Sequence, residues 1–415
     1  MEEKLEAIKN LLNKYNQNHL LNHYDGLSEE NKHVLLNQIL MLDFPLINTL
    51  YEEALKEKTF EDIDIKPIEF LEKSKLTPEL KQEFTTLGET SIKNHEFAVV
   101  TMAGGQGTRL GHSGPKGTFE VSIKGKNYSI FEILCQKLKK AYDKYNVHIP
   151  WYLMTSRENN KDTIAFFEKN NYFGYPKEYI RFFIQGELPM VDTKGKILLD
   201  ENRLIKLAAN GHGGIFSSML DSGTTYNMKT KGIKWVFISG VDNILANFVD
   251  PEFIGFAIKN NSPAAGKSVV KASPDEKVGV FCKKNGKPSV IEYSEISKEL
   301  AEAKATNGEL LFAESHLLLN LFSLDAIENI SQNKLPYHSA FKKADFLDEN
   351  GNFVKGEEPN SYKFESFLFD AFESLSKMDI FRVLREDEFA PIKNASGVDS
   401  PETAVALYEN WLDKN

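Results

Sequence analysis

The chain of 415 residues is 41% apolar and 27% charged, which is ample material for buried cores and favours two or three packed units over a single one. Its formal net charge of -10 argues against duplex nucleic acid or an anionic membrane as the main partner, because both are held largely by basic protein surface. Cys135 and Cys282 stand far apart and belong to no metal-binding motif, so we expect neither a zinc site nor a disulfide.

The N-terminus and the most apolar stretch together predict a cytoplasmic protein without a membrane segment. Five of the first nine residues are charged, so we expect no apolar signal-peptide core. The longest apolar stretch, residues 39–47, contains Asp43 and Pro45 and is too short to span a bilayer.

Residues 1–94 are predicted to form a helical region. Apolar residues recur at helical spacing in residues 5–12 and again in residues 34–40, and Ser28 precedes the second run as a candidate cap. No pattern of catalytic residues occurs here. We therefore expect a packing or partner-contacting region.

From Phe97 onward, short apolar runs of the kind found in buried parallel strands replace the helical pattern. These runs are residues 97–102, 149–154, 179–184 and 235–238. Between the first two, the sequence SIFE at 129–132 matches a capping box at the start of a helix. The alternation predicts an α/β sheet with its ligand at the carboxyl ends of the strands. We assign residues 95–330 to a catalytic domain and residues 331–415 to a smaller α+β region.

The second half of the catalytic domain is predicted to contain a hairpin and a helix. Residues 267–293 have the pattern of short strands, with a turn at Asn285 and Gly286. An amphipathic helix is expected over residues 317–327. The last region combines helix, a turn at Gly351 and a charged segment.

The most specific pattern is the glycine-rich sequence AGGQGTRLG at residues 103–111, followed by PKG at 115–117. A strand that ends in closely spaced glycines exposes backbone N–H groups to phosphate oxygens without a Cβ in the way. Two nearby cations, Arg109 and Lys116, suit a polyphosphate. The alternative is a glycine-rich turn that binds nothing.

Two better-known phosphate motifs do not fit the spacing. A Walker loop would require a glycine at Asn261, five residues before the GKS sequence at 266–268. The dinucleotide fingerprint, counted from Gly105, would place its third glycine at Leu110. The loop is therefore a different kind of phosphate site.

This loop resembles the GGxGTRLGxxxPKG hallmark of the UDP-sugar pyrophosphorylase family, and the chain most closely resembles its eukaryotic-type UDP-N-acetylglucosamine pyrophosphorylases. The resemblance extends from about residue 97 to about residue 395. Further motifs in the family's order are MTS at 154–156, FFIQG at 182–186, VDN at 241–243, EYSE at 292–295, KFE at 363–365 and REDEFAPIKN at 385–394. The resemblance implies a Rossmann-like, GT-A-like nucleotidyltransferase fold, with a mixed α/β sheet, an N-terminal helical region and a small C-terminal domain.

The resemblance also implies a reaction and its site. UTP and a sugar-1-phosphate would react with Mg²⁺ as cofactor, giving a UDP-sugar and pyrophosphate. The catalytic cations would be Arg109, Lys116 and Lys393. The nucleotide would be bound by Ala103, Gly104, Gly105, Gln185, Gly211 and Asp242, of which Asp242 would also hold the metal. The sugar would be bound by His212, Gly279, Glu292, His316, Phe367 and Phe369.

The residue types agree with these roles, although each has a plainer alternative. Asp242 follows an apolar strand, where a carboxylate meets a metal ion as readily as it caps a turn. Gln185 follows another, and its amide matches the edge of uracil but also suits a surface loop. Glu292, expected in an alternating strand, could accept bonds from sugar hydroxyls or face solvent. Phe367 and Phe369 are as typical of a core as of a pocket wall.

Two departures from the family pattern concern the sugar. The acetylamino-sugar enzymes usually carry asparagine where this chain has His212, and histidine there is typical of UDP-glucose and broad-specificity relatives. A second expected asparagine is replaced by His316. We expect N-acetylglucosamine-1-phosphate as substrate, with glucose-1-phosphate or broad specificity as the alternative. A UDP-sugar-binding module without turnover is the non-enzyme alternative.

Overall fold

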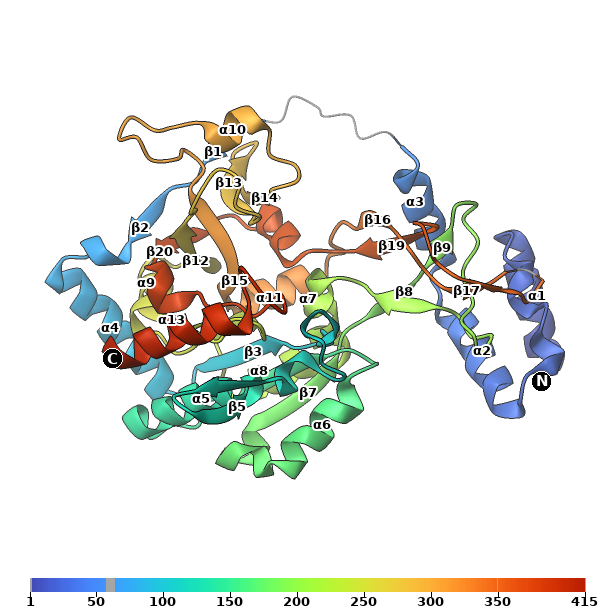
Figure 1. Ribbon diagram of the computed structural model, residues 1–415, viewed down its shortest axis with the longest axis horizontal. Helices are drawn as coiled ribbons and strands as arrows, with labels where there is room; N and C mark the ends of the chain where they lie inside the picture. Colours follow the sequence, from blue (N-terminus) through green and yellow to red (C-terminus); the bar gives the residue numbers. More distant parts are fainter. Residues whose placement is uncertain (1, 57–63, 349, 415) are drawn as a thin grey trace. The chain divides into compact units, whose positions relative to one another are not determined.

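The computed structural model describes residues 2–56, 64–348 and 350–414 (Figure 1). The chain forms two compact units, each assembled from three separate segments. The smaller unit consists of the described parts of Met1–Glu61, Gly186–Gly214 and Leu335–Phe367, and the larger unit contains the rest.

The larger unit is built on a mixed sheet of 11 strands among the described residues. Its main path is β2 (Phe70–Glu72), β20 (Asp379–Arg382), β12 (Ala264–Val270), β15 (Glu314–Ser323), β11 (Trp235–Gly240), β3 (Phe97–Met102), β6 (Trp151–Thr155) and β7 (Ile180–Ile184). Neighbours are parallel from β11 to β7, and β15 is antiparallel to both β11 and β12. The predicted α/β class and its four strands are confirmed.

A side branch of the same sheet contains β1 (Ile65–Pro67), β13 (Val280–Lys284) and β14 (Lys287–Ile291). Asn285 and Gly286 join β13 to β14 with φ angles of 50° and 79°, so the predicted hairpin turn is confirmed. A separate hairpin pairs β4 (Glu120–Ile123) with β5 (Lys126–Ser129).

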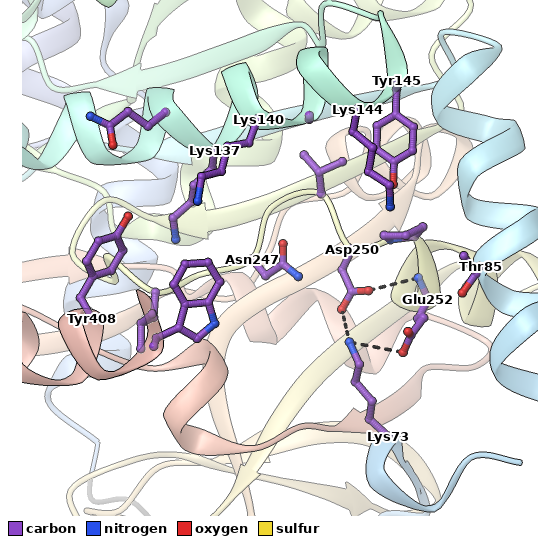
Figure 2. A pocket seen from close by; sticks show the side chains of 16 residues that line it. Lys73, Thr85, Lys137, Lys140, Lys144, Tyr145, Asn247, Asp250, Glu252 and Tyr408 are labelled. Atoms are coloured by element: carbon purple, nitrogen blue, oxygen red, sulfur yellow. Dashed lines mark hydrogen bonds and ion pairs between the residues drawn. The ribbon is translucent and has the colours of Figure 1, made fainter. Parts of the chain in front are cut away.

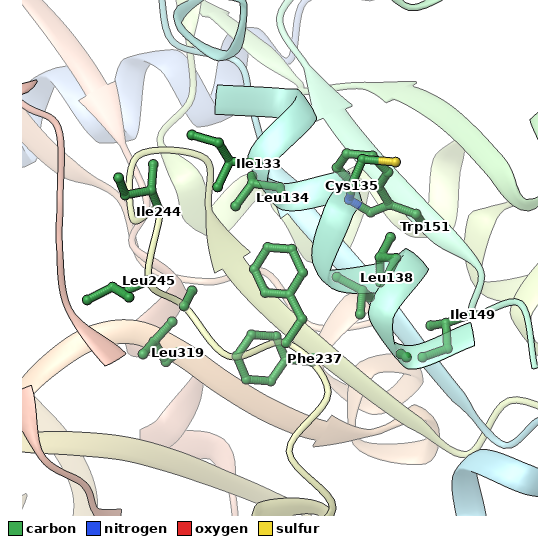
Figure 3. Close-up of a cluster of buried hydrophobic side chains, with 14 of the residues drawn as sticks. Ile133, Leu134, Cys135, Leu138, Ile149, Trp151, Phe237, Ile244, Leu245 and Leu319 are labelled. Carbon is green, nitrogen blue, oxygen red and sulfur yellow. The ribbon is translucent and has the colours of Figure 1, made fainter. Parts of the chain in front are cut away.

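Helices pack against this sheet and bury its apolar faces. The helices of the larger unit are α4 (Pro78–Lys93), α5 (Ile130–Tyr145), α6 (Asn160–Lys169), α7 (Ile215–Asp221), α8 (Thr224–Thr230), α9 (Pro251–Lys259), α10 (Lys298–Glu302), α11 (Leu324–Ser331), α12 (Arg385–Glu388) and α13 (Pro401–Lys414). The Ser129 hydroxyl caps α5 by accepting from the Glu132 N–H (3.1 Å), as predicted. Leu134 and Leu138 of this helix belong to one buried cluster with Phe237 of β11 (Figure 3).

The smaller unit packs three helices against short strands. Its elements are α1 (Glu2–Lys14), α2 (Glu29–Met41), α3 (Phe44–Ala54), β8 (Glu187–Pro189), β9 (Val191–Asp192), β10 (Leu207–Ala209), β16 (His338–Lys342), β17 (Phe346–Leu347), β18 (Phe353–Val354) and β19 (Ser361–Glu365). Ser28 caps α2 by accepting from the Asn31 N–H, as predicted. Ile8 and Ile39 share a buried cluster with Phe364 of β19.

Short 3₁₀ helices complete the chain. They are Asn18–Leu21, Tyr24–Gly26, Lys73–Lys75, Thr108–Leu110, Lys116–Thr118, Lys177–Tyr179, His212–Gly214 and Leu368–Ser374. The turn Asn171–Gly174 differs from them, because all four of its residues have positive φ.

No single helix in the described ranges is long and apolar enough to cross a membrane. The pair α2 and α3, bent by 70°, passes the same criteria of length and composition only when the two helices are combined.

Two predicted elements differ from the structure. Residues 1–94 are not helical throughout, because β1 and β2 lie within them; each strand has three residues, too few to produce a detectable alternation. The helix predicted over residues 317–327 is wrong, because β15 continues to Ser323 and α11 starts at Leu324. An unbroken apolar run fits a buried strand as well as a helix.

The compact units also differ from the three consecutive regions expected from the sequence. Residues 64–93 belong to the larger unit, where α4 packs against α9. The expected C-terminal region, residues 331–415, is divided after Phe367, and its β20 joins the large sheet. Strand pairing and packing between residues far apart in the chain decide this division, so local composition could not have predicted it.

Candidate functional site

The glycine-rich segment after β3 forms a closed loop. The Gly107 N–H donates to the Gly114 carbonyl (2.9 Å), and the Lys116 N–H donates to the Gly105 carbonyl (3.0 Å). Gly111 and Gly114 have φ angles of 68° and 151°, a backbone that favours glycine. The closure therefore brings Lys116 back beside the start of the loop.

The three predicted catalytic cations lie close enough to interact, with Arg109 and Lys393 both acting on Lys116. Lys116 Nζ is 4.0 Å from Asp242 Oδ2, and Lys393 Nζ is 3.5 Å from Asp399 Oδ2. Burial lowers the pKa of Lys116, and the Asp242 carboxylate opposes this effect. The charges of Lys393 and Arg109 lower that pKa further. Three cations against two carboxylates leave an excess of positive charge, which suits an anionic ligand such as a polyphosphate.

Asp242 and Lys393 are held by one hydrogen-bonded frame. The N–H of Ile392, which precedes Lys393, donates to the Asp242 carbonyl (2.9 Å). The side-chain amide of Asn243 donates to the Glu388 carbonyl (2.7 Å). Both Asn243 and Glu388 are buried. The frame fixes the spacing between the predicted metal-binding carboxylate and a predicted catalytic cation.

Gln185 lies directly against the start of the glycine loop. A Cβ placed on Gly104 would come within 2.9 Å of Gln185 Oε1, so glycine permits this close approach. Gln185 follows β7, as predicted, and its N–H donates to the Thr155 carbonyl (2.8 Å). The structure thus brings the Gln185 amide together with the glycine-rich loop, which contains Ala103 and Gly105. The resemblance places both the amide and this loop around the nucleotide.

Asn159 supports the same loop, and sequence reasoning missed it. Its side-chain amide donates to the carbonyls of Ala103 (2.9 Å) and Gly105 (3.4 Å), and its Oδ1 accepts from the Ser156 N–H (2.9 Å). The side chain is fully buried. Asn159 stands in the sequence SRENN, which contains no pattern that could have identified it.

Three of the predicted sugar residues meet beside the hairpin of the larger unit. A Cβ on Gly279 would come within 3.0 Å of Glu292 Oε1, and the His316 N–H donates to the Gly279 carbonyl (2.8 Å). Glu292 lies directly after β14 rather than within a strand, which corrects the expectation of an alternating strand. It is half-buried.

His316 lies in an aromatic enclosure. Its ring is nearly perpendicular to those of Phe281, Phe369 and Phe372, at centroid distances of 4.9, 5.8 and 5.6 Å. Its Nε2 lies 3.2 Å from the Asn320 side-chain nitrogen. Phe369 therefore lies beside His316, as the assignment of both to one pocket requires.

The remaining predicted residues, Gly211, His212 and Phe367, belong to the smaller unit. Gly211 has a φ of 83°, and a Cβ there would come within 2.2 Å of the Ser366 carbonyl oxygen. The His212 and Phe367 rings are 5.4 Å apart, and His338 stacks on Phe367 at 4.9 Å. The structure thus separates the two phenylalanines, which the sequence had treated as a pair, into different ring clusters.

The donor set fits Mg²⁺ only when phosphates complete it. Asp242 is one carboxylate, and the described part of the chain contains no group of three or more His, Cys, Asp or Glu side chains that could hold an ion. Gly240 leaves room for Asp242 Oδ1, which would lie 2.7 Å from a Cβ there. Mg²⁺ is commonly bound by one or two carboxylates together with substrate phosphates and water, and this arrangement fits that pattern.

Comparison with known proteins identifies the family to which the chain is similar. Residues 46–401 match the UTP–glucose-1-phosphate uridylyltransferase family. A probable UDP-N-acetylglucosamine pyrophosphorylase of Dictyostelium discoideum is 35% identical over 98% of this chain and 88% of that protein. The UDP-N-acetylglucosamine pyrophosphorylase of Saccharomyces cerevisiae is 40% identical over 80% of this chain and 73% of that protein.

A solved structure shares the fold. The crystal structure of the uridine diphosphate N-acetylglucosamine pyrophosphorylase of Trypanosoma brucei, in complex with an inhibitor, is 30% identical to this chain. The two align with a TM-score of 0.85 over 98% of this chain and 84% of that one. The nucleotidyltransferase fold expected from the sequence is confirmed.

Proposed function

The chain belongs to the UTP–glucose-1-phosphate uridylyltransferase family, and from this premise we propose that it joins UTP to N-acetylglucosamine-1-phosphate. The products are UDP-N-acetylglucosamine and pyrophosphate. The observation that carries the proposal is the convergence of Arg109 and Lys393 on Lys116, whose Nζ lies 4.0 Å from Asp242 Oδ2. The relatives at 35 to 40% identity bear the name of this activity.

In the proposed reaction, an oxygen of the sugar phosphate attacks the α-phosphorus of UTP in line with the leaving group. A bond forms between that oxygen and the α-phosphorus, and the bond to the bridging oxygen breaks, so pyrophosphate leaves with the electron pair. The nucleophile is already anionic at neutral pH, so no general base is required. Catalysis then consists of positioning and of stabilising negative charge.

Each cation has a distinct place in this scheme. Arg109 and Lys116 belong to the loop that would surround the phosphates of UTP, and Lys393 lies on the segment tied to Asp242. Asp242, with phosphate oxygens, would hold Mg²⁺, which when bound supplies neutralisation of phosphate charge. Gln185 would read the uracil edge from beside Gly104.

A direct assay tests the proposal. Purified protein with UTP, N-acetylglucosamine-1-phosphate and Mg²⁺ should release pyrophosphate and form UDP-N-acetylglucosamine in equal amounts, followed by a coupled assay and by chromatography. Omitting the sugar phosphate should abolish both signals. UTP binding without any product would instead identify a UDP-sugar-binding module.

Replacing Gln185 with alanine should weaken UTP binding by about 1–3 kcal/mol, because a hydrogen bond is lost and the uracil edge is left unpaired. It should also narrow the gap between UTP and other nucleotides. Calorimetric titration with UTP, CTP and ATP measures both effects. Gln82→Ala on the exposed face of α4 is the matched control. An unchanged preference for UTP in Gln185→Ala would show that a residue other than Gln185 recognises the base.

We expect N-acetylglucosamine-1-phosphate to be the better substrate and glucose-1-phosphate to react measurably. His212 and His316 replace amides that could pair with the acetamido group, and a site that lacks such a bond discriminates less sharply. Restoring both, as His212→Asn with His316→Asn, should raise the preference for the acetylated sugar. The ratio of kcat/KM for the two sugar phosphates measures it.

The single variants separate the two histidines. His316 is enclosed by phenylalanine rings, so His316→Asn should also lower stability, whereas His212→Asn should act mainly on selectivity. A ratio that stays unchanged in the double variant would place sugar selectivity in Gly279, Phe367 and Phe369 instead.

A further inference from the structure

The larger unit contains a cavity of about 410 Å³ that none of the predicted site residues lines (Figure 2). Its walls come from α4, α5, α13, residue 73 and the segment 245–252 that follows Asp242. In Figure 2, Lys137 extends from α5 into the cavity, and Asn247 and Asp250 lie on the opposite side. The cavity is therefore distinct from the catalytic centre but adjoins the segment that carries Asp242.

The lining is basic. It contains four lysines and two carboxylates, and three of the lysines, Lys137, Lys140 and Lys144, are spaced along one face of α5. Both carboxylates already have partners, since Lys73 Nζ lies 3.0 Å from Asp250 Oδ2 and 3.4 Å from Glu252 Oε2. The lysines of α5 are thus not neutralised by these two groups.

Lys137 is the most buried of the three lysines, and its Nζ stands 5.6 Å from the centre of the Phe248 ring. Its Nζ donates to the Ala246 carbonyl (2.7 Å), and no described carboxylate forms an ion pair with it. Burial lowers its pKa to about 7; Glu388 opposes this shift, and Lys267 and Lys140 add to it. An ammonium group enclosed without a counter-ion is unfavourable, and a bound anion would relieve that cost.

The other two lysines of α5 leave room for such an anion. Lys144 Nζ forms an ion pair with Glu89 at 3.2 Å, and Lys140 Nζ stands 5.4 Å from the centre of the Trp411 ring. Both Lys140 and Lys144 are exposed at the mouth of the cavity, whereas Lys137 is half-buried. An anion that entered past Lys140 would reach Lys137 and the backbone beside Ala246.

We infer that this cavity is a second anion site, which binds a small dianion of the phosphate class between Lys137 and Lys140. Because Ala246 and Asn247 belong to the segment that begins at Asp242, the occupant contacts the support of the catalytic carboxylate. The inference does not depend on the identity of the sugar or on turnover.

Sulfate is the probe for this site, since it remains a dianion over the whole range used. Its affinity is measured by tryptophan fluorescence at constant ionic strength from about pH 6 to 8.5, with chloride as the reference salt. Trp411 lines the cavity, so Trp411→Phe should remove the signal. All proteins compared in this test also carry Lys116→Ala. This substitution weakens any binding of sulfate at the catalytic centre.

Two substitutions of Lys137 carry the test. Lys137→Met should weaken sulfate binding about tenfold or more near pH 6, where the wild-type lysine is charged. Lys137→Arg should keep the binding and lose its pH dependence, because arginine stays protonated. In the wild type, affinity should fall towards tenfold per pH unit above the pKa of Lys137. Thermal unfolding confirms that each variant is folded.

Equal affinity in folded Lys137→Met and wild type would overturn the inference, and so would a signal that survives Trp411→Phe. Displacement of sulfate by inorganic phosphate or by pyrophosphate near pH 7 identifies which of the two fits. Displacement by neither would show that the cavity does not take the phosphate class. A protein that binds sulfate here but makes no UDP-sugar would refute the proposed function and leave this inference standing.

Discussion

Replacing Lys116 with alanine is expected to lower kcat by about 10²-fold or more, because its ammonium would stabilise charge that develops in the transition state. The side chain is 16% exposed and 4.0 Å from Asp242, at the point where Arg109 and Lys393 also converge. The loop backbone that returns Lys116 to Gly105 does not use its side chain, so the variant should stay folded. Pyrophosphate release at saturating substrates measures the effect.

The matched control is Lys126→Ala, which removes an exposed lysine from the nearby hairpin strand β5 and should leave kcat unchanged. Arg109→Ala should reduce kcat to a similar degree as Lys116→Ala, for the same electrostatic reason. Near-normal turnover in either variant would show that the residue concerned does not stabilise the transition state.

Replacing Lys267 with methionine is expected to lower the free energy of unfolding by about 3–5 kcal/mol, because it leaves the buried Glu388 carboxylate without its ion-pair partner and Asp250 with Lys73 alone. Lys267 is fully buried, and its Nζ lies 2.9 Å from Asp250 Oδ2 and 2.5 Å from Glu388 Oε1. Its position in a GKS sequence therefore reflects an internal ion pair rather than phosphate binding. Urea unfolding followed by tryptophan fluorescence measures the loss, since the three tryptophans all belong to the larger unit.

Lys259→Met is the control, since this exposed lysine pairs with Glu83 at the surface and such pairs contribute about 0–1 kcal/mol. The double variant Lys267→Met with Glu388→Gln should recover part of the loss, because the unpaired Glu388 carboxylate is removed. A loss below about 1 kcal/mol in Lys267→Met would mean that Lys73 and water compensate the two carboxylates fully.

The grouping of the candidate nucleotide-site residues could be predicted from the sequence because these residues follow the ends of recognisable strands. Gln185 comes directly after β7, Asp242 follows β11, and the glycine loop follows β3. These strands run parallel in the order β11, β3, β6 and β7, so their carboxyl ends place the three segments at the same edge of the sheet. A local pattern and one rule of sheet topology were sufficient here.

The parts that could not be predicted depend on contacts between distant residues. Asn243 binds the carbonyl of Glu388, which lies 145 residues further along the chain, and neither residue carries a local mark of this contact. The strand β15 was mistaken for a helix because residues 317–322 are all apolar except Asn320 and therefore show no strand alternation. Leu318 within the strand has a φ of 54°, which interrupts the alternation of its side chains. His316 belongs to this strand, but the rings that enclose it come from β13 and from the 3₁₀ helix Leu368–Ser374.

The three-part construction of the smaller unit has a consequence for how the protein is made. Helices α1 to α3 leave the ribosome well before Phe364, which completes their apolar cluster and follows roughly 300 residues later. At about 5–20 residues per second this delay is on the order of 15 to 60 s. The cluster that contains Ile8 and Ile39 stays incomplete during that interval, so we expect nascent chains to depend on holdase chaperones until translation has passed β19.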